Sequence, residues 1–319
     1  MAGSFQHELS WSPSRARTFN SCRRSYYYTY YLMWNGWSWS APDLRKTVYK
    51  LKKATRMPFV AGDVVHRAIH RFFKGRSQWN RVLDADDTAQ WAKRQFRQAY
   101  RESRDEAWKQ SLSRYTLLAE HLYDEADIQE DTGAAANYGR KFIQRIEQSV
   151  AHFFQLAELE EVRTTPPPTY LAIDEQDFDR NCFYWEDLKV HAGPDFAYRR
   201  DDGTVVIYDW KTGSPSEADE LQLRIYALYA REQWQVPVEN IQLVAGYLTE
   251  GSLRPVSVDA EILNQTIQYM ESSISEMKKL HFDAGDSDGD IEAFPMVPLA
   301  TDGSAPCTTC NFRQLCDRA

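Results

Sequence analysis

The stretch from Val190 to Gly213 constrains the fold more than any other part of the chain. Its sequence, VHAGPDFAYRRDDGTVVIYDWKTG, predicts a β-hairpin. The turn is Asp201-Asp202-Gly203, because Gly203 can take the positive φ of a short hairpin loop. The β-branched and aromatic residues from Thr204 to Tyr208 are typical of a strand. We therefore expect a β-sheet that contains this hairpin.

The register of the hairpin brings charged side chains together. If Arg200 pairs with Thr204, Asp195 lies opposite Asp209, with Cβ atoms roughly 4.5–5.5 Å apart. Asp209 and Lys211 are two residues apart on one strand, so their side chains share a face. Two carboxylates can hold a cation that polarises a phosphoryl oxygen and activates water, and the lysine can stabilise developing charge. The pattern indicates phosphodiester hydrolysis, with a solvated surface hairpin as the alternative.

The motifs of this region carry a family resemblance. Pro194-Asp195, a spacer and Asp209-Trp210-Lys211 resemble the PD-(D/E)xK nuclease superfamily. The following Gln222-Leu-Arg-Ile-Tyr226 is similar to the branch that includes the RecB nuclease domain, the AddB nuclease and Cas4. Gln222 and Tyr226 share a helical face, and the resemblance implies that they orient DNA or the lysine. One departure is the sequence before Asp195, which is Ala-Gly-Pro where that branch often has Gly-x-x.

The helix predicted over residues 62–73 contains a candidate metal ligand. A Gly followed four residues later by His resembles the same branch, which implies that His66 joins Asp195 and Asp209 in a Mg²⁺ or Mn²⁺ site. From the residues alone, a single helical His is more often structural, and His70 lies one turn further on. Glu175, on a strand predicted over 169–177, falls where relatives often carry Glu. It is a possible support for the metal or a basic residue, or a solvated strand acid.

The cysteines indicate a second metal site. Cys307, Cys310 and Cys316 form a C-x₂-C-x₅-C run, and two cysteines at x₂ spacing commonly share a metal. Cys22 is the best candidate for a fourth ligand. This layout resembles the iron–sulfur version of the Cas4/AddB branch and implies a [4Fe–4S] cluster that joins the N-terminal helix to the C-terminus. Zinc and unrelated buried thiols are the alternatives, and Cys182 is expected to be a small core residue.

Charge is distributed unevenly along the chain. The net charge is −8, but residues 15–76 hold 14 Lys or Arg against two acids, a net of +12, so the rest carries −20. A basic segment can follow a phosphate backbone, although a solvated basic face is the alternative. A helix is predicted from Arg15 to Leu32, capped by Ser12 or Ser14. Its aromatic run, Tyr26 to Tyr31, either stacks nucleic-acid bases or belongs to the core.

Composition places the chain among ordinary globular proteins. It has 319 residues, 43% of them hydrophobic, and no apolar run near the ~18–20 residues that cross a bilayer. The N-terminus lacks a secretory signal, and thiolate metal sites fit a reducing interior. We therefore expect a cytoplasmic protein without a membrane partner. There is no phosphate-binding loop, so a helicase motor or an integrase would act from another chain.

The expected fold class is α/β, with a restriction-endonuclease-like core of central mixed sheet flanked by helices. The segments are a basic, aromatic helical region (1–76), a helical insertion (77–168), the nuclease core (169–290) and a cysteine-rich end (291–319). The expected function is a divalent-metal-dependent DNA nuclease, a single-strand exonuclease of DNA repair, CRISPR adaptation or phage-related DNA processing. The alternatives are a non-catalytic DNA-binding scaffold subunit and a nuclease for RNA or modified DNA.

Overall fold

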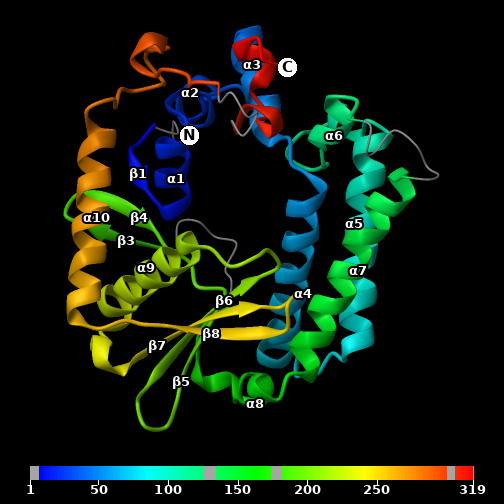
Figure 1. Cartoon of the computed structure of the whole chain (residues 1–319), viewed down its shortest axis with the longest axis vertical. Helices are drawn as coiled ribbons and strands as arrows, with labels where there is room; N and C mark the ends of the chain where they lie inside the picture. Colours follow the sequence, from blue (N-terminus) through cyan, green and yellow to red (C-terminus); the bar gives the residue numbers. More distant parts are fainter. Residues whose placement is uncertain (1–6, 126–133, 174–180, 300–305, 319) are drawn as a thin grey trace.

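The computed structural model describes residues 7–125, 134–173, 181–299 and 306–318. At its centre is a five-stranded sheet with the order β2-β5-β6-β7-β8 (Figure 1). β6 and β7 are parallel, and the other neighbours are antiparallel. The prediction of an α/β fold with a central mixed sheet is therefore confirmed. The strands are β2 (Tyr170–Ile173), β5 (Phe196–Arg199), β6 (Val205–Lys211), β7 (Ile241–Tyr247) and β8 (Ser252–Val256).

The hairpin of β5 and β6 has the predicted register. Phe196 pairs with Tyr208, and the Arg200 amide donates to the Thr204 carbonyl at 2.8 Å. Gly203 supplies the turn with a φ of +88°. The position just beyond the Phe196–Tyr208 pair belongs to Asp195 and Asp209, so both carboxylates lie at the same end of the hairpin.

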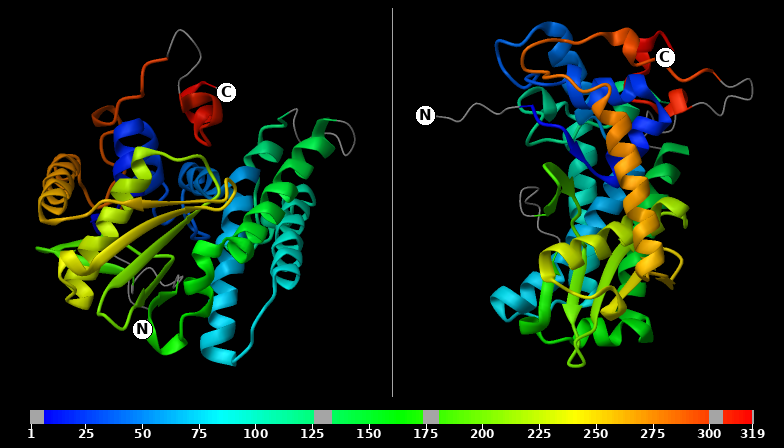
Figure 2. Two further views of the ribbon diagram at one scale, coloured as in Figure 1. Left: turned by 60° about the horizontal axis from the view of Figure 1, so that its bottom comes forward. Right: turned by 90° about the vertical axis from the view of Figure 1, so that its left-hand side faces the viewer.

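The two faces of the sheet pack against different helices (Figure 2). Val205 and Ile207 share a buried cluster with α9 (Glu217–Trp234) and α10 (Ala260–Lys278). The alternate residues, Val206, Tyr208 and Trp210, are buried against the helices of the other face, which are α4 (Met57–Trp79), α5 (Ala85–Arg104) and α7 (Ala134–Gln155). This alternation is the period of two that a strand covered on both faces requires.

The region predicted to be a helical insertion is helical in its described part. Besides α5 and α7 it contains α6 (Ala119–Leu122) and α8 (Glu160–Thr164), after which the prolines begin a 3₁₀ turn at Pro167–Thr169. α4 starts with Pro58 in its first turn and ends at Asn80, which has a φ of +47°. The proposed boundary at residues 76 and 77 lies inside α4, so this helix is shared by the first two segments.

The N-terminal helix is broken, contrary to the prediction of one helix from Arg15 to Leu32. α1 (Pro13–Ser21) ends at Cys22, whose φ of −161° and ψ of 115° are extended. α2 (Arg23–Tyr27) and a π-helical turn (Tyr28–Leu32) follow, and then α3 (Asp43–Lys53). Ser12 is the cap, since its hydroxyl accepts from the Arg15 amide at 3.1 Å. The base-stacking alternative is wrong for the tyrosines that are at most 3% exposed: Tyr26, Tyr27, Tyr28 and Tyr31.

A second, three-stranded sheet joins distant parts of the chain. β1 (Ser10–Trp11) pairs in parallel with β4 (Leu188–His191), which pairs with β3 (Cys182–Trp185). The C-terminal segment contains two 3₁₀ turns (Pro306–Thr309 and Arg313–Cys316) and lies near α2 and α3 in Figure 1. Among the described helices, none is both long enough and apolar enough to span a membrane.

Candidate active site

The two carboxylates of the hairpin are held at defined positions. Asp209 is 1% exposed on the buried strand β6. Asp195 precedes β5, and its Oδ2 atom accepts a hydrogen bond of 2.6 Å from the amide of Trp210. The same oxygen lies 3.3 Å from Nδ1 of His66 on α4. The β6 backbone and α4 therefore orient Asp195 from two sides.

The side chain of Asp209 belongs to a closed ring of contacts with Lys211, Gln222 and Tyr226. Nζ of Lys211 lies 2.5 Å from Oδ2 of Asp209 and donates to Oε1 of Gln222 at 2.8 Å. Nε2 of Gln222 donates to the Tyr226 hydroxyl at 2.5 Å, and that hydroxyl donates to Oδ1 of Asp209 at 3.5 Å. The four-residue spacing on α9 puts the amide and the phenol on one face. The ring fixes the direction of the lysine ammonium.

A third carboxylate, Asp219, also contacts the lysine and was not predicted from the sequence. Its Oδ1 atom lies 3.4 Å from Nζ of Lys211. Its Oδ2 atom accepts from the Ser216 amide at 3.0 Å and the Tyr247 hydroxyl at 3.1 Å. Asp219 is the third residue of α9 and forms a capping box with Ser216, the residue that caps the helix. The Ser-x-x-Asp signature before an apolar helix would have located it.

His66 reaches the carboxylates because α4 lies close to the end of β6. A Cβ atom on Gly62 would lie 3.0 Å from Oγ1 of Thr212, so glycine allows this close approach of the helix to the segment after β6. His70 is one turn further along α4 and contacts neither carboxylate in the described structure. Burial and the charge of Lys74 lower the pKa of His70 to about 4.

The charges of the site are coupled. Burial, followed by the charge of Asp195, raises the pKa of Asp209 to about 7 despite Lys211. Burial opposes the charged form of Asp195, but the His66 charge and the hydrogen bonds from His66 and Trp210 hold the Asp195 pKa below its usual value. Burial would also lower the pKa of His66, yet the two carboxylates raise it to about 9. Two cations therefore balance two buried carboxylates.

The donor set of the site suits a divalent cation. Two carboxylates are the oxygen ligands that Mg²⁺ or Mn²⁺ accepts, and the imidazole of His66 adds a nitrogen donor beside them. Within the described ranges, no three His, Cys, Asp or Glu side chains already stand in a metal-holding arrangement. His66 and Lys211 lie against the carboxylate oxygens instead, and supply the positive charge that buried carboxylates need. Glu175, the predicted support, lies outside the described residues.

A comparison with known families matches residues 10–317 to the PD-(D/E)XK nuclease superfamily. The chain belongs to this superfamily. No curated protein matches it at a significant level. The match covers nearly the whole chain, including the N-terminal helices and the cysteine-rich end.

Four cysteines of this nuclease-superfamily chain lie near one another. Burial is the main cause that raises the pKa of Cys310, and the charges of Cys22, Cys316 and Cys307 add to it. The Phe312 amide donates to Sγ of Cys310 at 3.4 Å, and Nη1 of Arg318 donates to Sγ of Cys307 at 3.1 Å. All these thiols are free. These contacts place the four thiols in one region, but within the described ranges no three of them already stand in a metal-holding arrangement.

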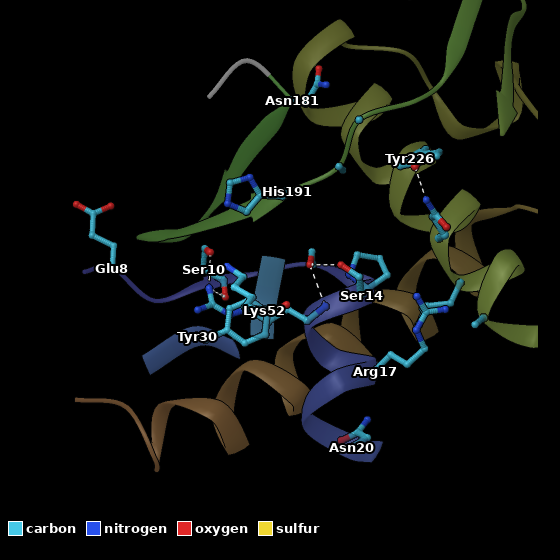
Figure 3. A pocket seen from close by; sticks show the side chains of 18 of the residues that line it. Glu8, Ser10, Ser14, Arg17, Asn20, Tyr30, Lys52, Asn181, His191 and Tyr226 are labelled. Atoms are coloured by element: carbon cyan, nitrogen blue, oxygen red, sulfur yellow. Dashed lines mark hydrogen bonds between the residues drawn. The ribbon is translucent and has the colours of Figure 1, made fainter. Parts of the chain in front are cut away.

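A cavity of about 1520 Å³ extends from the contact ring of Asp209, Lys211, Gln222 and Tyr226 toward the N-terminal region. Gln222 and Tyr226 line one end of it. Figure 3 shows Tyr226 and His191 on one side, with Ser10, Tyr30 and Lys52 on the other. The basic side chains that line the cavity are Arg15, Arg17, Lys52, Lys53 and Arg67. Gln222 and Tyr226 connect this basic cavity to the ring of contacts around Asp209.

Proposed function

We propose that this protein is a divalent-metal-dependent DNA nuclease that digests single-stranded ends, as in the RecB/Cas4-like branch. The observation that carries the proposal is the closed contact ring at the end of β6, which opens into a basic cavity. Asp195, Asp209 and His66 would hold Mg²⁺ or Mn²⁺. A bound divalent cation would polarise the phosphoryl oxygen and activate the attacking water.

The remaining side chains position charge. Burial would lower the pKa of Lys211, but Asp209, Asp195 and Asp219 outweigh it and raise that pKa. Lys211 therefore stays protonated and can stabilise negative charge that develops at phosphorus. Gln222 and Tyr226 keep the ammonium in place and line the cavity that would receive the strand.

The walls of the cavity bear on whether the substrate is single- or double-stranded. Its walls come from the N-terminal strand and helices on one side and from β4 and α9 on the other. Such an enclosed path with basic and polar walls favours a single strand, which can bend and expose its phosphates. A helicase or integrase that acts together with this protein would supply such a strand.

Cys22, Cys307, Cys310 and Cys316 would hold a [4Fe–4S] cluster, with zinc as the alternative. The role is structural. The Tyr28 ring lies 5.3 Å from the Phe312 ring, so the π-helical turn that follows α2 already packs against the C-terminal segment. A cluster would fix this contact covalently and hold the N-terminal wall of the cavity.

The test is digestion of end-labelled single- and double-stranded DNA by anaerobically purified protein with Mg²⁺ or Mn²⁺. We expect metal-dependent cleavage of single strands, and a loss of about 100-fold or more in Lys211→Ala. Lys279→Ala, at an exposed lysine of the α10 end that pairs with Glu276, is the control for charge. Binding without cleavage in either metal would favour a non-catalytic scaffold subunit. Cleavage that survives in Lys211→Ala would refute the site, and cleavage of RNA alone would refute the substrate.

A further inference from the structure

The N-terminal wall of the cavity carries a buried guanidinium without an acidic partner. Arg15 is 6% exposed. Its Nη1 atom donates to the carbonyl oxygen of Ser10 at 2.8 Å and to Oγ of Ser10 at 2.5 Å. Its Nε atom is buried and has no hydrogen-bond partner among the described residues. The described side chains place no carboxylate within 4.0 Å of it. A buried charge in this state is unfavourable unless an anion joins it.

Lys52 adds a second cation to the same wall. Its only close polar contact in the described structure is a distance of 3.9 Å from Nζ to the Met33 sulfur. Burial, then the charges of Lys53 and Arg15, lower the pKa of Lys52 to about 8. The ammonium therefore has donors to spare and no counter-ion.

One aromatic ring lies beside both cations. The guanidinium carbon of Arg15 is 4.1 Å from the centre of the Tyr30 ring, and Nζ of Lys52 is 5.9 Å from it. Cation–π contact attracts such groups to the ring face but supplies no negative charge. The ring therefore holds the cations close together without neutralising them.

The acidic side chains that line the cavity do not act as counter-ions for Arg15 and Lys52. Asp63 is paired with Arg67 at 3.0 Å. Glu8 and Glu217 are exposed and line the cavity without lying within 4.0 Å of either cation. Figure 3 shows Lys52, Ser10 and Tyr30 grouped on the wall away from Tyr226. At one end the cavity thus has Gln222 and Tyr226, which contact Lys211 and Asp209, and elsewhere it has cations without a counter-ion.

We propose that Arg15 and Lys52 form a phosphate subsite, which holds one phosphate of the substrate strand while a different phosphodiester lies at Asp195 and Asp209. The inference rests on the proposed nuclease function and adds a second fixed point on the strand. The bound group is a nucleic-acid phosphate, either an internal phosphodiester or a terminal phosphate. Two fixed points set the position of the scissile bond along the strand.

The experiment measures binding without cleavage. A fluorescent single-stranded 20-mer is titrated with protein in EDTA, and affinity is read by anisotropy at several salt concentrations. In Lys52→Met we expect affinity to fall about tenfold, as for the loss of a charged hydrogen bond. The slope of log affinity against log salt should fall by about 0.7, the value for one phosphate on a single strand. Lys46→Met, on the exposed side of α3, removes the same charge and should leave both unchanged, and Lys52→Arg should restore binding.

A set of strands, each with one neutral methylphosphonate, then locates the phosphate. At one linkage the methylphosphonate should lower the affinity of the wild type about tenfold. It should not lower the affinity of Lys52→Met any further, because the two changes remove the same contact. The same comparison with 5′- and 3′-phosphorylated strands identifies a terminal phosphate. The subsite would be overturned if each methylphosphonate lowered the affinity of both proteins equally. It would also be overturned if Lys52→Met had the affinity and the salt slope of the wild type. If that happens while the wild type still cleaves DNA, the nuclease function stands; if the wild type neither binds nor cleaves, both proposals fall.

Discussion

Gly246→Ala tests how the packing of the sheet positions the site. Gly246 pairs with Trp210 in the parallel ladder of β6 and β7. A Cβ atom on Gly246 would lie 2.7 Å from Cε3 and 2.9 Å from Cζ3 of the Trp210 ring, closer than real contacts allow. The ring is 1% exposed, stacks on Tyr208 with centroids 5.0 Å apart and meets Phe153 edge-on at 5.6 Å. It has no free space to enter, so the backbone of β6 must shift.

The shift affects stability and catalysis together. Overpacking of a dense core costs about 1–3 kcal/mol. With 319 residues and an unfolding entropy of about 2.1 cal/mol/K per residue, 2 kcal/mol lowers Tm by about 3 °C. The amide of Trp210 holds Asp195 at 2.6 Å, and a misplacement near 1 Å costs about 100-fold in rate. We therefore expect a small loss of stability and a 10- to 100-fold loss of nuclease activity.

Calorimetry and the DNA digestion assay measure the two effects. Gly213→Ala is the matched control, because a Cβ atom there would have no neighbour within 4 Å. Trp210→Phe in the Gly246→Ala background should relieve the contact, so the double variant should lose less stability than the two single variants added together. Wild-type Tm and activity in Gly246→Ala, or strict additivity in the double variant, would refute the argument.

Two further predictions concern the metal sites. With pKa values of about 9 for His66 and about 7 for Asp209, a cation must displace protons, so Mg²⁺ affinity should rise roughly tenfold per pH unit between pH 7 and 9 and level off above. Titration calorimetry should show that the Mg²⁺ affinity of His66→Gln depends much less on pH, whereas that of His70→Gln depends on pH as in the wild type. The same pH dependence in the wild type and both variants would contradict the proposed ligands. Cys22→Ser should abolish the visible absorbance and bound iron of anaerobically purified protein, whereas Cys182→Ser should retain both. Zinc in place of iron in the wild type would select the alternative metal.

The parts of the site that the sequence predicted are those with local geometry. The register of the hairpin follows from its turn and from strand alternation, so the placement of Asp195 beside Asp209 needed no knowledge of the rest of the chain. The contact between Gln222 and Tyr226 follows from helical spacing. Each of these relations spans fewer than twenty residues. Because the members of each pair are close in sequence, the local strand or helix geometry alone determines how they lie relative to each other.

The features that the sequence did not reveal depend on contacts between distant segments. β1 is two residues long and pairs with β4 about 180 positions later, and so short a strand has no periodicity to detect. The break at Cys22 is also invisible to periodicity, because the aromatic residues on both sides of it suit a helix. Asp219 was not predicted for another reason. Its position in the sequence indicates a helix cap, and nothing in the sequence shows that the same side chain also contacts Lys211.

The break at Cys22 connects the cysteines to the cavity. α1 has nine residues, with Arg15 near its start and Cys22 just after its end, a length of about 13 Å at 1.5 Å per residue. A helix of this length is stiff, so whatever fixes Cys22 against the C-terminal cysteines also fixes the position of Arg15 on the cavity wall. A cluster on these thiols would therefore serve the strand path without touching DNA. It follows that Cys22→Ser should weaken metal-free binding of single strands in the same direction as Lys52→Met, while Mg²⁺ binding at Asp195 and Asp209 remains intact.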